Sequence, residues 1–239
     1  MYQSASHRIV PVSDCMFEDT VADQIIVTIR GLLKSFKVRP YDGDTGRGTL
    51  RHVLVRRGWR SGEILVVLVT AHGMLPGKRN VVRALLQRHP DITTIVQNIN
   101  AGQTSLVLGP HSEVLYGPGY IHGQLGDCTF RISPRAFYQI NPVQTEVLYR
   151  TALDYAGLTG KETVVDAYCG TGTIGIFASR NAARVIGVEN NRDAVRDAIS
   201  NAKANRADHV RFYPADASDF LQGLARPGEP PHAHILHPP

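Results

Sequence analysis

The strongest constraint on the fold is the regular alternation of strand and helix patterns after residue 162. Short apolar runs typical of buried strands cover residues 163–167, 184–188, 210–213 and 233–236, and helical patterns cover residues 172–180, 192–205 and 217–224 between them. Parallel strands joined by single helices form sheets with helices on both faces. The pattern therefore predicts a doubly wound α/β sheet of the Rossmann type in this part of the chain.

The earlier part of the chain mixes helices and strands without strict alternation. Amphipathic helices are predicted at residues 19–36 and 79–88, and strands at residues 50–55, 64–70, 92–99, 104–108, 112–116 and 128–132. The strands at 50–55 and 64–70 suggest an antiparallel pair. Asn141, followed by Pro142 and Gln144, has the N-terminal signature of a helix that runs to about residue 155. We therefore expect an α+β domain over residues 1–140 and an α/β domain over residues 141–239.

Composition and cysteine usage narrow the class of protein. The chain has 239 residues, of which 43% are hydrophobic, and its sequence contains no apolar run of membrane-span length and no signal-peptide pattern. Its three cysteines, Cys15, Cys128 and Cys169, form no CxxC pair, so the spacing predicts neither a disulfide framework nor a self-contained zinc site. A soluble cytoplasmic protein with reduced thiols is expected.

Positive charge is concentrated in the first part of the chain. Residues 1–159 hold 17 Lys and Arg against 12 Asp and Glu, whereas residues 160–239 hold 9 of each kind, which together give the net charge of +5. A stretch without acidic residues contains Arg47, Arg51, Arg56, Arg57 and Arg60. Such a run is typical of a surface that contacts a phosphate backbone. A solvated strand face is the alternative interpretation.

A glycine-rich loop follows the first predicted strand of the α/β sheet. Residues 170–175 read GTGTIG, and Glu189 lies 19 residues after Gly170 at the end of the next strand. By itself this motif is compatible with a dinucleotide, as in nicotinamide-dependent dehydrogenases, or with an adenosyl cofactor. Asp166 ends the preceding strand, and a carboxylate about 4 Å from a phosphate costs on the order of 4 kcal/mol at an effective dielectric constant of about 20. S-adenosylmethionine has a cationic amino group and sulfonium and no phosphate, so Asp166 favours it.

Further residues have expected roles in this cofactor site. Gly170 and Gly172 allow the backbone to come close to the cofactor. Glu189 is placed to accept hydrogen bonds from the two ribose hydroxyls. Asp216, just past the third strand, is placed to meet the adenine amino group. Capping the next helix is the alternative role for Asp216.

Several stretches of the chain resemble the RNA uracil-5-methyltransferases, the family that forms 5-methyluridine in ribosomal or transfer RNA. The matching segments are residues 6–15, 50–56, 95–100 (IVQNIN), 132–142 (ISPRAFYQINP) and 165–174 (VDAYCGTGTI). They cover nearly the whole chain, and the last two together are more specific than a GxGxxG motif. The segment at 95–100 is most similar to the branch that acts on 23S ribosomal RNA.

The resemblance implies a cofactor, a partner and a set of contact residues. The cofactor is S-adenosylmethionine, and the partner is RNA rather than DNA or a membrane. Gln139, Tyr168, Glu189 and Asp216 match the family's cofactor-contact positions. The alternatives are a local hydrogen bond at the helix end for Gln139 and a packing role for Tyr168.

The family's reaction needs residues that this chain does not contain. In the family a cysteine thiolate attacks C6 of uracil, C5 takes the methyl group, and a glutamate base removes the C5 proton. Both residues follow an Asp-Pro-Pro segment, whereas this chain ends at His237-Pro238-Pro239. No catalytic residue is therefore assigned. We expect an internal fragment of a longer enzyme that is inactive alone, with a non-catalytic RNA-binding remnant as the alternative.

Cys15 is the single candidate metal ligand. It matches the last of four cysteines that hold an iron–sulfur cluster in one branch of the family, and a cluster requires four ligands as a rule. The other three have no counterpart in this sequence, so a cluster is expected only in a complete protein. Cys128 and Cys169 are expected to be buried packing residues.

Overall fold

The computed structural model describes residues 4, 10–13, 15–16, 18–224 and 231–236. The chain divides into two compact units, which we treat separately. Unit 1 comprises Met1–Gly58 and Gly62–Ile121, and unit 2 comprises Trp59–Ser61 and His122–Pro239. The domain boundary that we expect between residues 140 and 141 stays a prediction.

Unit 1 is built on a mixed four-stranded sheet. Its elements are α1 (Thr20–Ser35), β1 (Leu50–Arg57), β2 (Ile64–Thr70), α2 (Lys78–Arg88), β3 (Ile92–Ile99) and β4 (His111–Tyr116). The strand order is β1-β2-β3-β4, with β2 and β3 parallel and the two outer pairs antiparallel. The expected antiparallel pairing of the first two strands is therefore confirmed.

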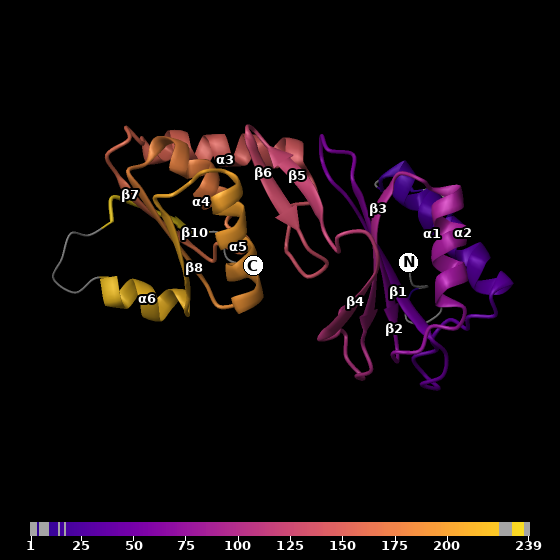
Figure 1. Ribbon diagram of the computed structural model, residues 1–239. Coiled ribbons are helices and arrows are strands. Elements are labelled where there is room, and N and C mark those ends of the chain that lie inside the picture. The colour runs from indigo at the N-terminus through magenta and orange to yellow at the C-terminus, as the bar shows by residue number, and fades with distance from the viewer. Residues whose placement is uncertain (1–3, 5–9, 14, 17, 225–230, 237–239) are drawn as a thin grey trace. The chain divides into compact units, whose positions relative to one another are not determined.

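Both helices of unit 1 cover one face of this sheet (Figure 1). α1 begins at Asp19, whose side chain accepts hydrogen bonds from the N–H groups of Val21 and Ala22. Its apolar stripe, which includes Ile25 and Ile29, packs with residues of β2 and α2 into one buried cluster. This is the amphipathic arrangement that the 3.6-residue spacing predicts.

Residues 104–108 are not a strand, which corrects the prediction from the sequence. In the structure they belong to a loop of bends between β3 and β4. The side-chain amide of Asn100 donates to the carbonyls of Leu106 and Val107 at 2.7 and 3.2 Å. Side chains that bond the backbone in this way compete with strand pairing, so the apolar pattern did not become a strand.

Unit 2 contains a hairpin, a helix and a parallel sheet. The hairpin consists of β5 (Ile121–Leu125), which the sequence analysis did not predict, and β6 (Cys128–Ile132). The remaining elements are α3 (Pro142–Ala156), β7 (Thr163–Ala167), α4 (Thr173–Ala178), a 3₁₀ turn (Ser179–Asn181), β8 (Arg184–Glu189), α5 (Arg192–Ala204), β9 (Val210–Pro214), α6 (Ala217–Leu224) and β10 (Ala233–Leu236). The sheet order is β10-β7-β8-β9, all parallel.

Helices lie on both faces of the parallel sheet (Figure 1). On one face, Val164 and Val185 pack with residues of α3, α4 and α5. On the other, Val165 and Ile186 pack against α6. The doubly wound α/β fold predicted from the strand–helix alternation is confirmed.

Three further expectations from the sequence concern cysteine burial, membrane-spanning helices and His237. Cys128 and Cys169 are buried, as expected for packing residues. Within the described ranges, every helix is too short or too polar to span a bilayer. His237, which stands where the family's segment has Asp, lies outside the described residues.

Candidate cofactor site

The carboxyl ends of three neighbouring parallel strands bring the predicted acidic residues to one edge of the sheet. Asp166 pairs in register with Gly187, one position before the end of β7, and Glu189 is the last residue of β8. Asp216 lies two residues after the end of β9. Ligands of open α/β sheets bind at this edge, so the fold places the three carboxylates where a cofactor is expected.

Asp166 is a buried carboxylate with one oxygen left unpaired. Its Oδ2 accepts a hydrogen bond from the Gly175 N–H at 2.9 Å, and its Oδ1 has no partner among the described residues. Burial is the main cause that raises the pKa of Asp166 to about 7, and the nearby charge of Glu189 raises it further. A cationic group next to Asp166 would stabilise the ionised form of this buried carboxylate.

Glu189 is held by the glycine loop. Its Oε2 accepts a hydrogen bond from the Gly170 N–H at 3.1 Å, and its Oε1 accepts one from the Asn191 N–H at 2.7 Å. These two backbone donors fix the plane of the carboxylate at the mouth of the loop. Each oxygen keeps a lone pair for another donor, so Glu189 is suited to receive a diol.

Two glycines of the loop adopt the left-handed conformation for different reasons. Gly172 has φ 80°, and a Cβ atom built there lies 2.6 Å from Cζ of Phe212. Gly170 has φ 55°, and a Cβ atom there meets nothing within 4 Å. Gly172 is therefore required for packing, whereas Gly170 borders open space that a ligand can enter.

Tyr168 has an unusual backbone conformation for a residue with a side chain. Its φ is 65°, in the left-handed region that glycine prefers, and the residue is 40% exposed. A non-glycine residue in this region costs roughly 1–2 kcal/mol, and such strain is concentrated at functional sites. The exposed ring is presented beside the loop and is not buried in the core, contrary to a pure packing role.

Gln139 and Asp216 differ in how far the structure constrains them. Gln139 lies half-buried between β6 and α3, and its side chain makes no hydrogen bond to another described residue. Asp216 is exposed, and its Oδ1 accepts hydrogen bonds from the N–H groups of Ser218 and Asp219 at 2.8 and 3.2 Å. Asp216 therefore caps α6, the alternative that the sequence left open, and one of its oxygens is already used.

One contact of the loop was not predicted from the sequence. The buried side chain of Asn201 on α5 donates to the carbonyl of Thr171, between the two glycines. No spacing rule relates these residues, which are 30 positions apart. The only signal in the sequence is an amide side chain on the apolar face of a helix.

No metal site is evident in the part of the chain that the structure describes. Among those residues, no group of three His, Cys, Asp or Glu side chains is close enough to hold a metal ion. Cys15 is half-buried in unit 1, and its N–H donates to Asp23 at 3.0 Å. The iron–sulfur ligand role of Cys15 stays a prediction.

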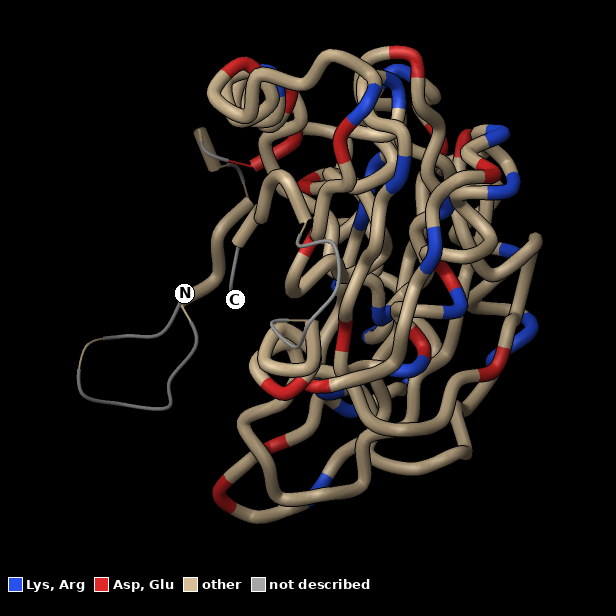
Figure 2. The backbone as a smooth tube through the Cα atoms, turned by 90° about the vertical axis from the view of Figure 1, so that its left-hand side faces the viewer, with Lys and Arg blue, Asp and Glu red and all other residues tan. Residues whose placement is uncertain are grey.

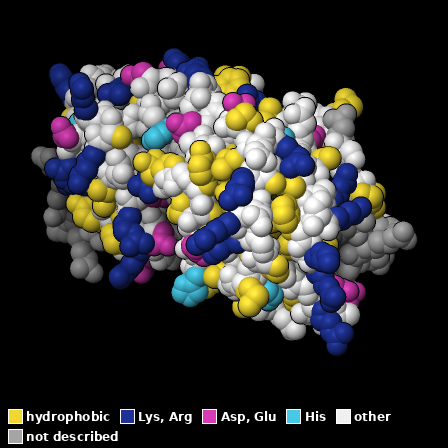
Figure 3. All heavy atoms as spheres, turned by 45° about the vertical axis from the view of Figure 1, so that its right-hand side comes forward, with side chains coloured by type: hydrophobic (Ala, Val, Ile, Leu, Met, Phe, Trp, Pro, Cys, Tyr) yellow, Lys and Arg dark blue, Asp and Glu magenta, His cyan; other side chains and the backbone are white. Residues whose placement is uncertain are grey.

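Three arginines of the acid-free stretch make internal contacts. Their partners are the carbonyl of Asn100 for Arg51 (2.8 Å), Asp19 for Arg57 (2.9 Å) and Glu146 for Arg60 (3.1 Å). Basic and acidic positions are interspersed along the backbone (Figure 2), and Lys and Arg side chains are scattered over the face that Figure 3 displays. Arg57 and Arg60 remain exposed despite these ion pairs, and the phosphate-contacting role of the stretch stays a prediction.

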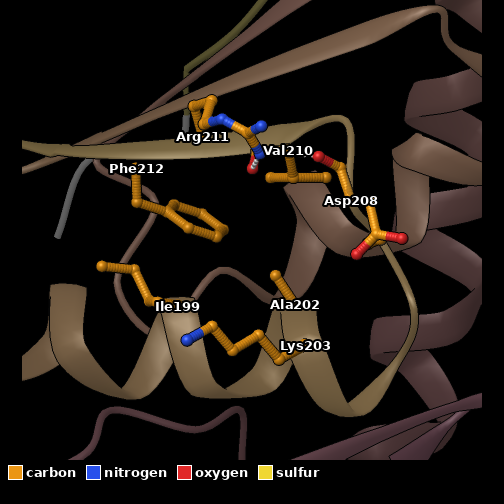
Figure 4. A pocket seen from close by; sticks show the side chains of 8 residues that line it. Ile199, Ala202, Lys203, Asp208, Val210, Arg211 and Phe212 are labelled. Carbon is orange, nitrogen blue, oxygen red and sulfur yellow. Dashed lines mark hydrogen bonds between the residues drawn. The ribbon is translucent and has the colours of Figure 1, made fainter.

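A cavity of about 350 Å³ lies between α5 and β9. Figure 4 shows Ile199 and Lys203 of α5 facing Phe212 of β9 across it. Glu189 and Asp216 do not line it, so this cavity is separate from the carboxylate edge described above.

The residues at the carboxylate edge are compatible with S-adenosylmethionine. The unpaired Oδ1 of Asp166 and the fixed carboxylate of Glu189 match a ligand with a positive charge and a ribose diol. The negative charge of Glu189, joined by that of Asp166 when it is ionised, disfavours a pyrophosphate.

Comparison with known proteins supports this interpretation. Residues 158–226 match the family model described as a methyltransferase domain. The chain is 41% identical over 238 residues to an uncharacterized RNA methyltransferase of Halalkalibacterium halodurans and 40% identical over 238 residues to one of Clostridium acetobutylicum. Each match covers 100% of this chain and 52% of the relative, so the chain spans about half the length of the curated relatives that it matches.

A solved structure agrees with the fold. The tRNA (uracil-54, C5)-methyltransferase of Pyrococcus abyssi, in complex with S-adenosyl-L-homocysteine, superposes with a TM-score of 0.71 at 25% identity. The match covers 87% of this chain and 50% of that one. The fold is thus the Rossmann-like fold of S-adenosylmethionine-dependent methyltransferases. The matched relatives are named RNA methyltransferases, and this chain is similar to them over its whole length.

Proposed function

We propose that this chain carries the cofactor site of an S-adenosylmethionine-dependent RNA methyltransferase that forms 5-methyluridine, with 23S ribosomal RNA as the substrate. The observation that carries the cofactor assignment is the buried Asp166 carboxylate beside Glu189, with one oxygen unpaired. The RNA substrate is supported by relatives at 41% and 40% identity that are named RNA methyltransferases. The choice of uracil C5 is supported by the Pyrococcus abyssi tRNA enzyme and by the motif resemblance of residues 132–142 and 165–174.

Each cofactor contact is assigned by its chemistry. Asp166 and Gln139 would hold the amino-acid part, Glu189 the ribose hydroxyls, and Asp216 the adenine amino group through the oxygen that does not cap α6. Tyr168 would lie against the cofactor. When bound, S-adenosylmethionine supplies an electrophilic methyl group.

Two cysteines of unit 2 are poor candidates for the nucleophile that uracil methylation needs. Cys128 and Cys169 are buried, and burial raises the pKa of each thiol above its usual value. A thiolate is the nucleophilic form, so these two groups are not suited to attack uracil. We propose that the nucleophile and the general base are supplied from outside these 239 residues, and that the isolated chain binds cofactor without transferring methyl groups.

The cofactor assignment is tested by ligand-dependent stability. A ligand at 100 times its Kd stabilises a protein by about 2.7 kcal/mol, so S-adenosylhomocysteine is expected to raise the melting temperature of the purified chain. NAD is the matched control, because it also contains an adenosine but adds a pyrophosphate. A rise with NAD and none with S-adenosylhomocysteine would overturn the cofactor assignment.

The substrate assignment is tested by methyl transfer. Unmodified 23S ribosomal RNA is incubated with radiolabelled S-adenosylmethionine and either the isolated chain or a longer protein that includes it. Label in 5-methyluridine is expected with the longer protein alone. Label in another nucleoside would refute the proposed target, and 5-methyluridine formed by the isolated chain would refute the missing nucleophile.

A further inference from the structure

Three side chains of α5 follow the outer edge of β6. The contacts are Ser133 Oγ to Asp197 Oδ2 at 2.8 Å, Arg131 N–H to Asn201 Oδ1 at 2.8 Å, and Thr129 N–H to Asn205 Oδ1 at 2.8 Å. The chain advances by two residues along the strand for every four residues along the helix, in opposite directions. Two strand residues span about 6.7 Å and four helix residues about 6.0 Å, so the spacings match. We call these three contacts the α5–β6 ladder.

The ladder takes the place of a neighbouring strand. β6 pairs with β5 on one edge only, and a buried N–H or C=O group without a partner is costly. Asn205 completes its contact by donating Nδ2 to the Thr129 carbonyl at 2.7 Å. The two asparagines are therefore fully engaged and buried, with Asn201 1% exposed and Asn205 8% exposed.

Asn201 differs from Asn205 in one respect. Its Nδ2 donates to the carbonyl of Thr171 at 3.0 Å, whereas the Asn205 Nδ2 donates to the carbonyls of Thr129 and Asn201 and to none in the glycine loop. Thr171 is 3% exposed and lies between Gly170 and Gly172. The Asn201 side chain thus links the loop directly to β6.

This link joins the two segments that carry the proposed cofactor contacts. β6 ends at Ile132 and leads into residues 133–141, which contain Gln139. The other segment is the loop that places the Gly170 N–H on Glu189. A single amide side chain therefore spans both segments.

We infer that Asn201 is a positioning residue for the cofactor site: it fixes the Thr171 carbonyl, and through it the glycine loop, relative to the strand that leads to Gln139. This inference rests on the proposed cofactor function. Asn201 does not itself touch the cofactor. Its replacement changes affinity because the loop samples conformations that do not bind, and the apparent Kd rises in proportion to the loss of the competent state.

The matched substitutions are Asn201→Asp and Asn205→Asp. Each keeps the acceptor for β6 and replaces the donating NH₂ with an oxygen that faces backbone carbonyls, that of Thr171 in one case and those of Thr129 and Asn201 in the other. Asn205→Asp is expected to lose at least as much stability as Asn201→Asp, because its NH₂ makes one more hydrogen bond. Asn201→Asp is expected to weaken S-adenosylhomocysteine binding at least tenfold by calorimetry, and Asn205→Asp less than threefold.

A milder pair keeps the test decisive if the Asp variants do not fold. In Asn201→Ala and Asn205→Ala, hydrogen exchange is measured without ligand at the amides of Gly170, Gly172 and Gly175, which donate to Glu189, Cys169 and Asp166. Faster exchange at these amides in Asn201→Ala alone is the expected result. Equal changes in both Ala variants would overturn the inference.

The two proposals fail in different ways. If wild-type protein does not bind S-adenosylhomocysteine, the proposed function fails, and the exchange comparison alone decides whether Asn201 orders the loop. If wild-type protein binds and both Asp variants lose the same affinity, the proposed function stands. In that case Asn201 is only a structural residue, and the inference about it is wrong.

Discussion

Replacing Gly172 with alanine tests whether the glycine loop is shaped by packing against β9. Gly172 has φ 80°, and an added Cβ lies 2.6 Å from Phe212 Cζ and 3.1 Å from the Ala198 Cβ. The same edge of the Phe212 ring also meets Gly187, because a Cβ on Gly187 would lie 2.3 Å from Phe212 Cδ1. The ring therefore packs against two glycine backbones, and a methyl group on Gly172 would force it to shift.

The expected cost has two parts. A non-glycine residue in the left-handed region costs roughly 1–2 kcal/mol, and overpacking a buried contact costs about 1–3 kcal/mol. Gly172→Ala is thus expected to lower the free energy of unfolding by about 3 kcal/mol. Gly170→Ala is the control, since it has φ 55° and nothing within 4 Å of its Cβ, and it is expected to cost about 1 kcal/mol.

The two variants are compared by urea unfolding, followed by far-ultraviolet circular dichroism and linear extrapolation. A difference of about 2 kcal/mol corresponds to a factor of roughly 30 in the folding equilibrium. Costs that agree within about 0.5 kcal/mol would refute the argument, because they would leave only the shared backbone strain. A larger cost for Gly170→Ala would refute it too.

Two further predictions concern acidic residues. Because burial raises the pKa of Asp166 from 3.8 to about 7, the folded state keeps a proton between about pH 4 and 7 that the unfolded chain releases, so stability falls as pH rises through this window. Asp166→Asn keeps the acceptor for Gly175 and is expected to be more stable than wild type at pH 8 and equal to it near pH 4 in urea titrations; parallel pH curves would contradict this. Asp216→Ser keeps a cap for α6, whereas Asp216→Ala loses it and is expected to be about 1 kcal/mol less stable. Both are expected to bind S-adenosylhomocysteine equally weakly, and wild-type affinity in the Ser variant would show that the carboxylate makes no adenine contact.

The part of the fold that the sequence predicts well is governed by local pattern. Strand and helix patterns after residue 162 alternate at the expected lengths, and each pattern corresponds to an element of the parallel sheet. Asn141 accepts a hydrogen bond from the Gln144 N–H at 3.1 Å and caps α3, as its spacing predicts. In both cases the information lies within a few residues of the element.

The errors arise where something other than the hydrophobic pattern of a segment decides its structure. Residues 104–108 have a strand-like composition, but the Asn100 side chain donates hydrogen bonds to two carbonyls of this loop. β5 was missed because its sequence, Ile-His-Gly-Gln-Leu, has a glycine at its centre. The ion pairs of Arg57 with Asp19 and of Arg60 with Glu146 could not be predicted, because the partners lie 38 and 86 residues away in the sequence.

The candidate site shows the same division between local and distant information. Its carboxylates were predictable because parallel strands end at a common edge, which needs only the strand positions. The burial of Asp166 and the link through Asn201 could not be predicted from the sequence, because they depend on how α4 and α5 pack near the strand ends. An orphaned oxygen on a buried carboxylate lowers stability, and no described residue supplies the missing charge or donor. Proteins retain such unfavourable features mainly at functional sites. A ligand with a cationic group would pair with the free oxygen of Asp166 and offset this cost.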